Sequence, residues 1–351
     1  MRHSFTSERQ SGTPSGPSGG LLDTRHGRRA FLGGAAGLIG AAAYATYGGA
    51  IASAFGPRPT SGDLTTATLG FLPITDVAPF FLGQSLGYFE EEGLEIEHTF
   101  AAGGAVILPS VESGEFDIGY SNIVSLLLIQ SRGGKYKVIA GGGKTALDDE
   151  RDYSENWVLN DSEIQGLADL SGKTVAINTL SNALEIVVRK AVDEAGGDHE
   201  SINFVEIPFP EMGAALESGE VDAIQYNEPF QTILEQGGTA RSIGKPFNVA
   251  AGGEVLAYYF VKEENIDGPV ATGFSAAMAK ANAYAAEHEQ ELRDIITTYT
   301  EVPQEIADLL IMPTYVEESV PESSLEVYAG LMTEYGLVEE MPDFAALLPD
   351  S

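Results

Sequence analysis

The residues best able to do chemistry are small polar groups that follow short apolar runs. Asp76 comes shortly after the apolar run 66–71. Its carboxylate has two interpretations, a cap for the helix that follows or an acceptor that faces a ligand, and one residue can do both. Gly104 opens another helical pattern, and the free N–H groups at a helix start can bind an anion or a carbonyl oxygen. These positions point to binding chemistry.

Further polar groups follow later apolar runs. Ser121 and Asn122 precede the helical pattern 123–131, where Ser121 could act only as a cap and Asn122 could lie in solvent. After the run 174–177, the segment 178–182 holds four small polar residues, more than one cap needs. We expect ligand contacts from these positions, which are Ser121, Asn122, Asn178, Ser181 and Asn182.

The segment Tyr226-Asn227-Glu228-Pro229 follows the apolar run 221–225. Glu228 has two interpretations, a hinge residue without ligand contact or a second carboxylate of the site. We predict that Tyr226 and Glu228 border the binding site. Lys144, after three glycines, is interpreted as a solvated hinge lysine.

Several kinds of chemistry are excluded or unsupported. The chain has no cysteine, which excludes disulfides and thiolate metal sites. His98, His199 and His288 show no metal-ligand spacing. No phosphate loop, nucleophile elbow or Ser/His/Asp set is present. We therefore expect no metal, no cofactor and no catalytic residue.

Short apolar runs alternate with helical patterns from residue 64 onward. Strands are predicted over 66–71, 94–100, 116–120, 137–141, 157–159, 174–178, 203–207, 221–225 and 255–262, with helices between them. Such alternation is typical of βαβ units with parallel-rich sheets. The pattern restarts once, which predicts two Rossmann-like α/β lobes with two crossover segments and a helical C-terminal tail. Functional loops should lie at the carboxyl ends of the strands, facing a cleft.

The predicted boundaries follow from these patterns. Residues 64–145 and 250–351 form lobe 1, and 146–249 form lobe 2 with the crossings. Residues 57–63 read as a linker. Residues 1–56 hold a polar leader and Arg28-Arg29 before an uncharged segment, as in a twin-arginine export signal. We expect the body to lie outside the cytoplasm, either released by cleavage near residues 50–54 or anchored by an uncleaved segment.

Several segments resemble a known family over about residues 64–262. They are 73–79, 86–94, 103–105, 113–119, 166–176, 215–223 and 228–230, among which 113–119 holds Ser113-Gly114-Glu115-Phe116-Asp117 and 215–223 holds Ser218-Gly219-Glu220-Val221-Asp222. In order and spacing they are similar to the sulfonate, taurine, nitrate and thiamine-precursor binding proteins of ABC importers. The resemblance implies the type II periplasmic-binding-protein fold and capture of a small solute by lobe closure. It also implies a permease and a separate ATPase as partners. We expect a monomer that does not bind nucleic acid.

Two further questions stay open at this point. The candidate loops hold Asp76 and Glu228 and no arginine, which favours a nitrogen heterocycle such as a thiamine-precursor pyrimidine. Taurine, which carries both charges, is the alternative solute, ahead of nitrate and other sulfonates. The rival function is an enzyme on the same fold, a pyrimidine-precursor synthase or a menaquinone-pathway dehydratase. The absent cysteines and the export signal argue against it.

The acidic composition predicts dependence on salt. The chain has 52 acidic and 19 basic side chains, and the part after residue 54 carries a formal charge of −36, with 50 acidic and 14 basic groups. Such a surface repels nucleic acid and fits a halophilic source with an acidic proteome, although an ordinary acidic secreted protein is the alternative. We expect the melting temperature to fall between molar and millimolar salt, because carboxylate repulsion is then unscreened. Equal melting temperatures in thermal scans at both salt concentrations would contradict the halophilic interpretation.

Overall fold

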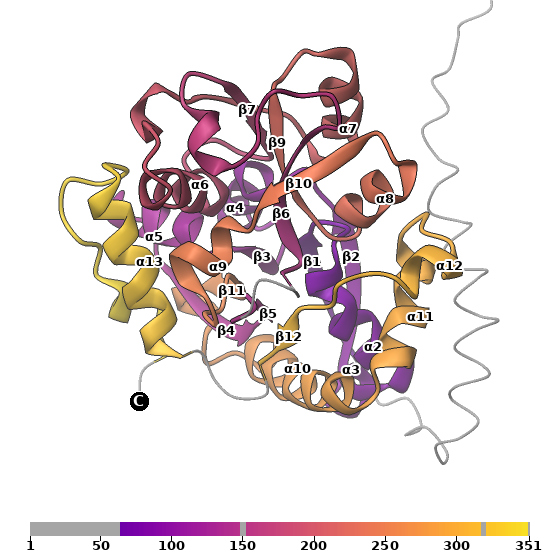
Figure 1. The fold of residues 1–351 in the computed structure, drawn as a ribbon. Coiled ribbons are helices and arrows are strands. Elements are labelled where there is room, and N and C mark those ends of the chain that lie inside the picture. The colour runs from indigo at the N-terminus through magenta and orange to yellow at the C-terminus, as the bar shows by residue number, and fades with distance from the viewer. Residues whose placement is uncertain (1–63, 148–151, 317–320, 350–351) are drawn as a thin grey trace, which may run out of the picture.

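The computed structural model describes residues 64–147, 152–316 and 321–349. The predicted leader, export signal and linker lie outside these ranges. The described chain forms two five-stranded sheets, each covered by helices, with one continuous core that reaches into both. Figure 1 shows the two sheets stacked one above the other. The α/β fold class is confirmed.

The first sheet has the strand order β2-β1-β3-β11-β4. Its strands are β1 (Thr65–Phe71), β2 (Leu94–Phe100), β3 (Ile118–Asn122), β4 (Tyr136–Gly141) and β11 (Ala257–Lys262). Strands β2, β1 and β3 run parallel, whereas β11 is antiparallel to both β3 and β4. The predicted strand 255–262 thus contributes β11 to the first sheet, after the chain has formed the second sheet.

Helices cover both faces of this sheet. They are α2 (Ala78–Leu86), α3 (Tyr88–Glu91), α4 (Gly104–Ser113), α5 (Ile123–Ser131), α10 (Pro269–Glu287), α11 (Glu289–Tyr299) and α12 (Gln304–Ala307). Parallel crossovers are right-handed, so the reversal of direction in β2-β1-β3 places α2 and α4 on opposite faces. We call this sheet with these helices lobe 1.

The second sheet has the strand order β10-β6-β9-β7-β8. Its strands are β6 (Ser154–Leu159), β7 (Thr174–Ile177), β8 (Asn203–Glu206), β9 (Ala223–Asn227) and β10 (Ala240–Gly244). Strands β9, β7 and β8 are parallel, and β6 is antiparallel to both of its neighbours. Its helices are α6 (Ala183–Glu194), α7 (Phe209–Ser218), α8 (Phe230–Gly237) and α9 (Pro246–Ala251). We call this unit lobe 2; the residue boundaries of the two lobes stay a prediction.

The C-terminal part ties the lobes together. A small ladder joins β5 (Gly143–Lys144) to β12 (Thr314–Tyr315) beside the crossings. Helix α13 (Glu322–Glu334) packs against α5 of lobe 1 and against α6 and α9 of lobe 2, at the left of Figure 1. Lys144 pairs within the ladder, so the interpretation as a simple solvated lysine misses its backbone role.

The helical segment that the sequence predicts between the first two strands is not continuous. A 3-10 turn covers Thr75–Val77, α2 then ends at Leu86, and Gly87 adopts φ +83° before α3 begins. A left-handed residue of this kind ends a helix, and glycine adopts it without a Cβ clash. Asp76 therefore lies inside the 3-10 turn and not at the cap position of a helix.

Glu228 is buried at the corner between β9 and α8. Its carboxylate accepts the Thr232 hydroxyl at 2.6 Å and the backbone N–H of Ile311 at 3.0 Å, and its backbone carbonyl accepts the N–H of Thr75 at 3.4 Å. Burial raises its pKa to about 7, while these hydrogen bonds lower it. Glu228 therefore joins lobe 2 to the C-terminal segment and to lobe 1, as a hinge residue would.

We predict that Glu228→Ala lowers the melting temperature by several degrees. The substitution leaves the part-buried N–H of Ile311 and the buried hydroxyl of Thr232 without their acceptor, and each unmet buried group costs about 1–3 kcal/mol. Glu326→Ala, on an exposed face of α13, is the matched control and should melt within about a degree of wild type. Unchanged melting of Glu228→Ala in differential scanning calorimetry would rule out this role.

Candidate functional site

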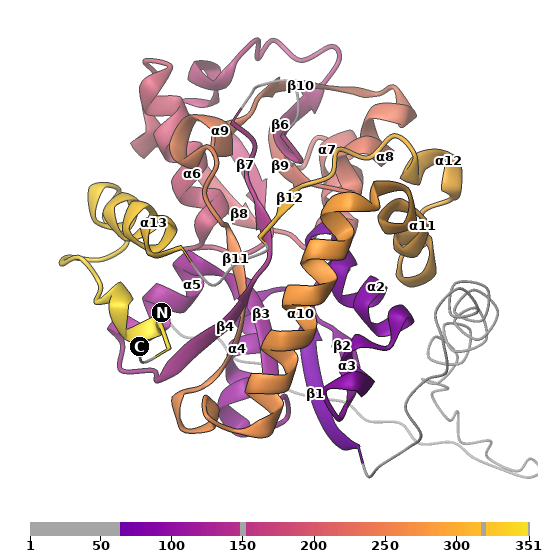
Figure 2. The same ribbon diagram turned by 90° about the horizontal axis from the view of Figure 1, so that it is seen from below.

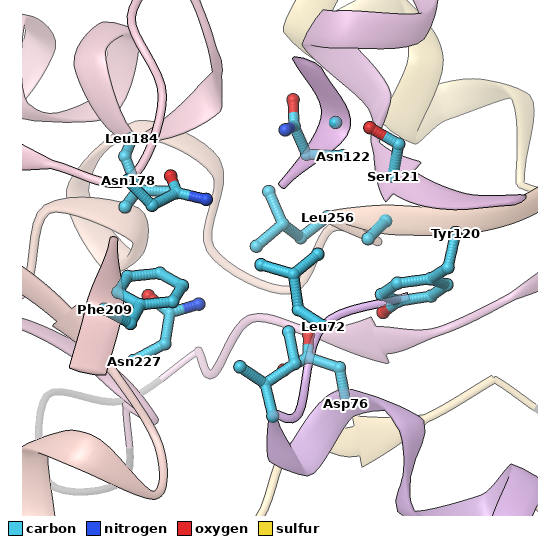
Figure 3. A pocket seen from close by; sticks show the side chains of 13 residues that line it. Leu72, Asp76, Tyr120, Ser121, Asn122, Asn178, Leu184, Phe209, Asn227 and Leu256 are labelled. Atoms are coloured by element: carbon cyan, nitrogen blue, oxygen red, sulfur yellow. The ribbon is translucent and has the colours of Figure 1, made fainter. Parts of the chain in front are cut away.

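A pocket lies between the two lobes, at the carboxyl ends of strands from both sheets. Its empty volume, including the part open to solvent, is about 410 Å³. It is lined by Leu72, Ile74, Asp76, Gly104, Tyr120, Ser121, Asn122, Asn178, Leu184, Phe209, Asn227, Leu256 and Ala257. Figure 3 shows Asn178, Phe209 and Asn227 from lobe 2 facing Asp76, Tyr120 and Ser121 from lobe 1.

The position of the pocket follows from the topology. Strands β1, β3, β7 and β9 end at Phe71, Asn122, Ile177 and Asn227, and the lining residues Leu72, Asn122, Asn178 and Asn227 lie at or just beyond these ends. The carboxyl ends of parallel strands meet at one edge of a sheet, and here the two edges face each other. Figure 2, a view from below, shows the strands of both sheets leading toward this region.

The lobes approach closely beside the pocket. A Cβ on Gly103 would come 2.8 Å from the Thr179 hydroxyl oxygen of lobe 2, and one on Gly104 would come 2.7 Å from the Ser121 hydroxyl oxygen. Only glycine fits at such distances. The glycine pair therefore lets α4 begin directly against the site, with no side chain between the helix start and the pocket.

Asp76 is the charged group of the pocket and is almost fully buried, at 1% exposure. Within the described residues, neither of its carboxylate oxygens has a hydrogen-bond partner of good geometry. Burial raises the pKa of Asp76 to about 7, and its own backbone N–H and the nearby Tyr120 hydroxyl lower it only in part. Neither the 3-10 turn nor α2 uses Asp76 as a side-chain cap, so the cap interpretation is wrong.

Tyrosine hydroxyls surround this carboxyl group. Those of Tyr120, Tyr153 and Tyr259 are buried and, in the part of the chain that the structure describes, have no hydrogen-bond partner of good geometry, although the Tyr120 hydroxyl lies near enough to Asp76 to lower the pKa of that carboxyl group. The rings of Tyr120 and Tyr259 lie 4.7 Å apart between centroids. Because unmet buried polar groups are costly, this concentration of them marks a place built to receive a polar partner.

The helix cap of α5 is Asn122, and not Ser121 as one interpretation of the sequence predicts. The Asn122 carboxamide oxygen accepts the Ser125 N–H at 3.0 Å and so caps α5. The Ser121 hydroxyl is buried without a partner among the described residues and faces the pocket. The interpretation of Ser121 as the cap is wrong, because the strand extends to Asn122 and the helix begins one residue later.

In the segment 178–182, Asn178 is the residue that lines the pocket. Asn182 is buried and caps α6 by accepting the Glu185 N–H, and its Nδ2 donates to the Asn178 oxygen at 2.8 Å. Ser181 is exposed, with a left-handed φ of 55°, and its N–H donates to Glu185. Neither Ser181 nor Asn182 lines the pocket; Asn182 instead holds Asn178 in place.

Tyr226 and Glu228 also lie outside the pocket lining. The Tyr226 hydroxyl donates to the Phe209 carbonyl at 2.8 Å and accepts the Gly213 N–H, which anchors α7 and with it the pocket residue Phe209. Sequence reasoning missed Asn227 between them. Its signal was its place as the last residue of β9, where side chains alternate in direction.

The lining contains no His, Lys, Arg or Cys. Among the described residues, no group of three or more His, Cys, Asp or Glu could hold a metal ion. None of the described helices is both long and apolar enough to cross a membrane. The site can therefore offer hydrogen bonds, one carboxyl group and apolar contacts from Leu72, Leu184 and Phe209.

Comparison with known proteins supports the same architecture. The formylaminopyrimidine-binding protein of Halalkalibacterium halodurans is 24% identical over 238 residues, which cover 67% of this chain and 68% of that protein. Among solved structures, the alkanesulfonate-binding protein SsuA of Xanthomonas axonopodis pv. citri superposes with a TM-score of 0.70 at 15% identity, covering 83% of this chain and 100% of that one. The nitrate-binding protein NrtA of Synechocystis PCC 6803 gives 0.67 at 15% identity, covering 82% and 86%.

These structural neighbours share the periplasmic-binding-protein fold, which confirms the fold that the sequence motifs indicated. The NMT1/THI5-like family model matches residues 74–292, a span that contains every residue lining the pocket except Leu72. The chain belongs to the NMT1/THI5-like family.

Proposed function

We propose that this chain is the solute-binding component of an ABC importer and that it captures a small polar solute between its lobes. The observation that carries the proposal is the interlobe pocket with a buried, unpartnered Asp76. A solute bound there would touch both lobes, so binding favours the closed arrangement. The similar proteins are solute-binding proteins, among them a ligand-binding component of an ABC-type import system, which supports the same role.

The pocket chemistry favours a solute with N–H groups. The carboxylate of Asp76 needs a donor, and a lining without Lys or Arg offers no counter-charge to nitrate or to a simple sulfonate. A thiamine-precursor pyrimidine fits best, in line with the formylaminopyrimidine-binding relative. Capture would break no bond, and a permease with a separate ATPase would take up the released solute.

The direct test is a thermal-shift and calorimetric titration in molar salt. Formylaminopyrimidine should raise the melting temperature and bind more tightly than nitrate, because a ligand that prefers the folded state stabilises it. Stabilisation by nitrate alone would contradict the pyrimidine assignment. Turnover of the bound solute would favour the enzyme alternative.

We predict that Asp76→Asn weakens solute binding about tenfold to a hundredfold. The folded pKa of Asp76, about 7, lies above its unfolded value of 3.8, so its contribution to stability declines as pH rises from about 4 to about 7. The asparagine removes a buried charge, so the ligand-free variant should melt no lower than wild type at pH 8. Wild-type affinity for an N–H solute should also fall from pH 8 to pH 6, and the variant should lose this dependence.

Asp117→Asn is the matched control for Asp76→Asn. Asp117 precedes β3, at the end away from the pocket, and accepts the N–H and hydroxyl of Thr68. This variant should melt earlier and keep wild-type affinity, the opposite of Asp76→Asn. If Asp76→Asn melted early at pH 8 and bound normally, Asp76 would be structural and the site assignment would fail.

We further propose export by the twin-arginine route, with the N-terminal segment cleaved or left as an anchor. The support is Arg28-Arg29 before an uncharged segment. Replacing both with lysine should leave the protein in the cytoplasm in cell fractionation, whereas Arg25→Lys should not. Normal surface delivery of the double variant would contradict this route.

A further inference from the structure

Three asparagines of the pocket wall have their carboxamide oxygens already occupied. The oxygen of Asn122 accepts the Ser125 N–H at 3.0 Å, that of Asn178 accepts Asn182 Nδ2 at 2.8 Å, and that of Asn227 accepts the Ser154 hydroxyl at 2.7 Å. A carboxamide whose oxygen is engaged presents its NH₂ group on the other side. Figure 3 shows the nitrogens of Asn178 and Asn227 directed into the pocket.

These orientations are set by the protein. The Ser125 N–H can only donate, so the Asn122 oxygen must face it. The Glu185 N–H likewise holds the Asn182 oxygen, which leaves Asn182 Nδ2 to face Asn178. Reversing either carboxamide would set a donor against a donor.

Asn227 is held from lobe 2 by a hydroxyl. The Ser154 hydroxyl accepts a hydrogen bond from Gln225 Nε2 at 2.7 Å and donates one to the Asn227 oxygen. In the described chain, none of the three pocket asparagines donates its NH₂ group to a protein acceptor. Beside them α4 begins at Gly104, where no side chain covers the positive end of a ten-residue helix.

We propose that the pocket has a fixed polarity: Asn122, Asn178 and Asn227 hold hydrogen-bond acceptors of the solute, and Asp76 holds a donor. This inference rests on the proposed solute-binding function and narrows its ligand class. The solute is a small bipolar molecule, neutral or zwitterionic, with an amino or ammonium group at one end and a carbonyl or sulfonate oxygen at the other. An acceptor-only ion such as nitrate meets three donors but leaves the buried carboxyl group of Asp76 without a partner.

The arrangement also couples the acceptor end to closure. Asn122 ends β3 of lobe 1, whereas Asn178 follows β7 and Asn227 ends β9 of lobe 2. A solute oxygen shared among these NH₂ groups bridges the lobes, whereas Asp76 belongs to lobe 1 alone. Binding of the solute's acceptor oxygen by both lobes is therefore the interaction that favours the closed form over the open one.

The test uses Asn122, because its capping role can be kept while its donor is removed. Serine and aspartate cap helices as well as asparagine does, so Asn122→Ser and Asn122→Asp should melt close to wild type. Asn122→Ser should bind formylaminopyrimidine and taurine about tenfold more weakly, and Asn122→Asp, which places an acceptor against an acceptor, about a hundredfold. The control is Asn265→Asp, the same charge change at an exposed site outside the pocket, with no loss of affinity.

The probes are two bipolar solutes, formylaminopyrimidine and taurine, with nitrate as the acceptor-only and methylammonium as the donor-only ion, each titrated calorimetrically. Binding of a bipolar probe that the Asn122 variants weaken, with neither simple ion competing, supports the inference. Equal affinity of Asn122→Asp and wild type for that probe overturns it and leaves the solute-binding role intact. Tighter binding of nitrate than of both bipolar probes also overturns it. Failure of all four probes counts against both the proposed function and this inference.

Discussion

Two buried carboxyl groups at the junction of the lobes govern the rest of this structure. Burial raises the pKa of both Asp76 and Glu228 to about 7. Glu228 recovers hydrogen bonds from Thr232 and Ile311, whereas Asp76 finds no partner of good geometry within the described chain. Hydrogen bonds from the protein reduce the cost of burying Glu228, whereas the carboxyl group left unsatisfied is available to a ligand. The same cost of burying a carboxyl group therefore distinguishes Glu228, which acts at the hinge, from Asp76, which acts in the pocket.

The polar groups around Asp76 extend this division of roles. Asn182, Ser154 and Tyr226 make their hydrogen bonds to protein groups, and each supports a pocket residue: Asn178, Asn227 and Phe209 respectively. Rigid support of this kind lowers the entropy lost when a solute binds, since the donors are already oriented. The geometry of the site therefore depends on these supporting residues as much as on the residues that line the pocket.

The sequence located the pocket by one rule, that binding residues lie at the carboxyl ends of parallel strands. That rule does not tell which side chains at those ends are already bonded within the protein. Asp76, Gly104, Ser121, Asn122 and Asn178 line the pocket because they lie at or after the converging carboxyl ends of strands. Tyr226 and Glu228 also lie at the carboxyl end of a strand, yet their side chains hydrogen-bond to Phe209 and to Ile311. Phe209 and Ile311 lie on other elements, so no local sequence pattern predicts these two contacts. Contact of the five pocket residues with a solute stays a prediction.

What the sequence determined by itself is local or compositional. The alternation of apolar runs and helical patterns specified the α/β class, the motifs indicated the family, and the lack of cysteine excluded thiolate chemistry. The tertiary structure alone decided which polar groups face the pocket and which way the Asn227 carboxamide points, whereas the Asn122 and Asn178 carboxamides are oriented by partners three and four residues away. The reason is separation along the chain: the partner of Asn227 is 73 residues away and that of Glu228 is 83. Helical and strand periods span only a few residues, whereas hydrogen bonds over such separations exist only once the lobes have packed.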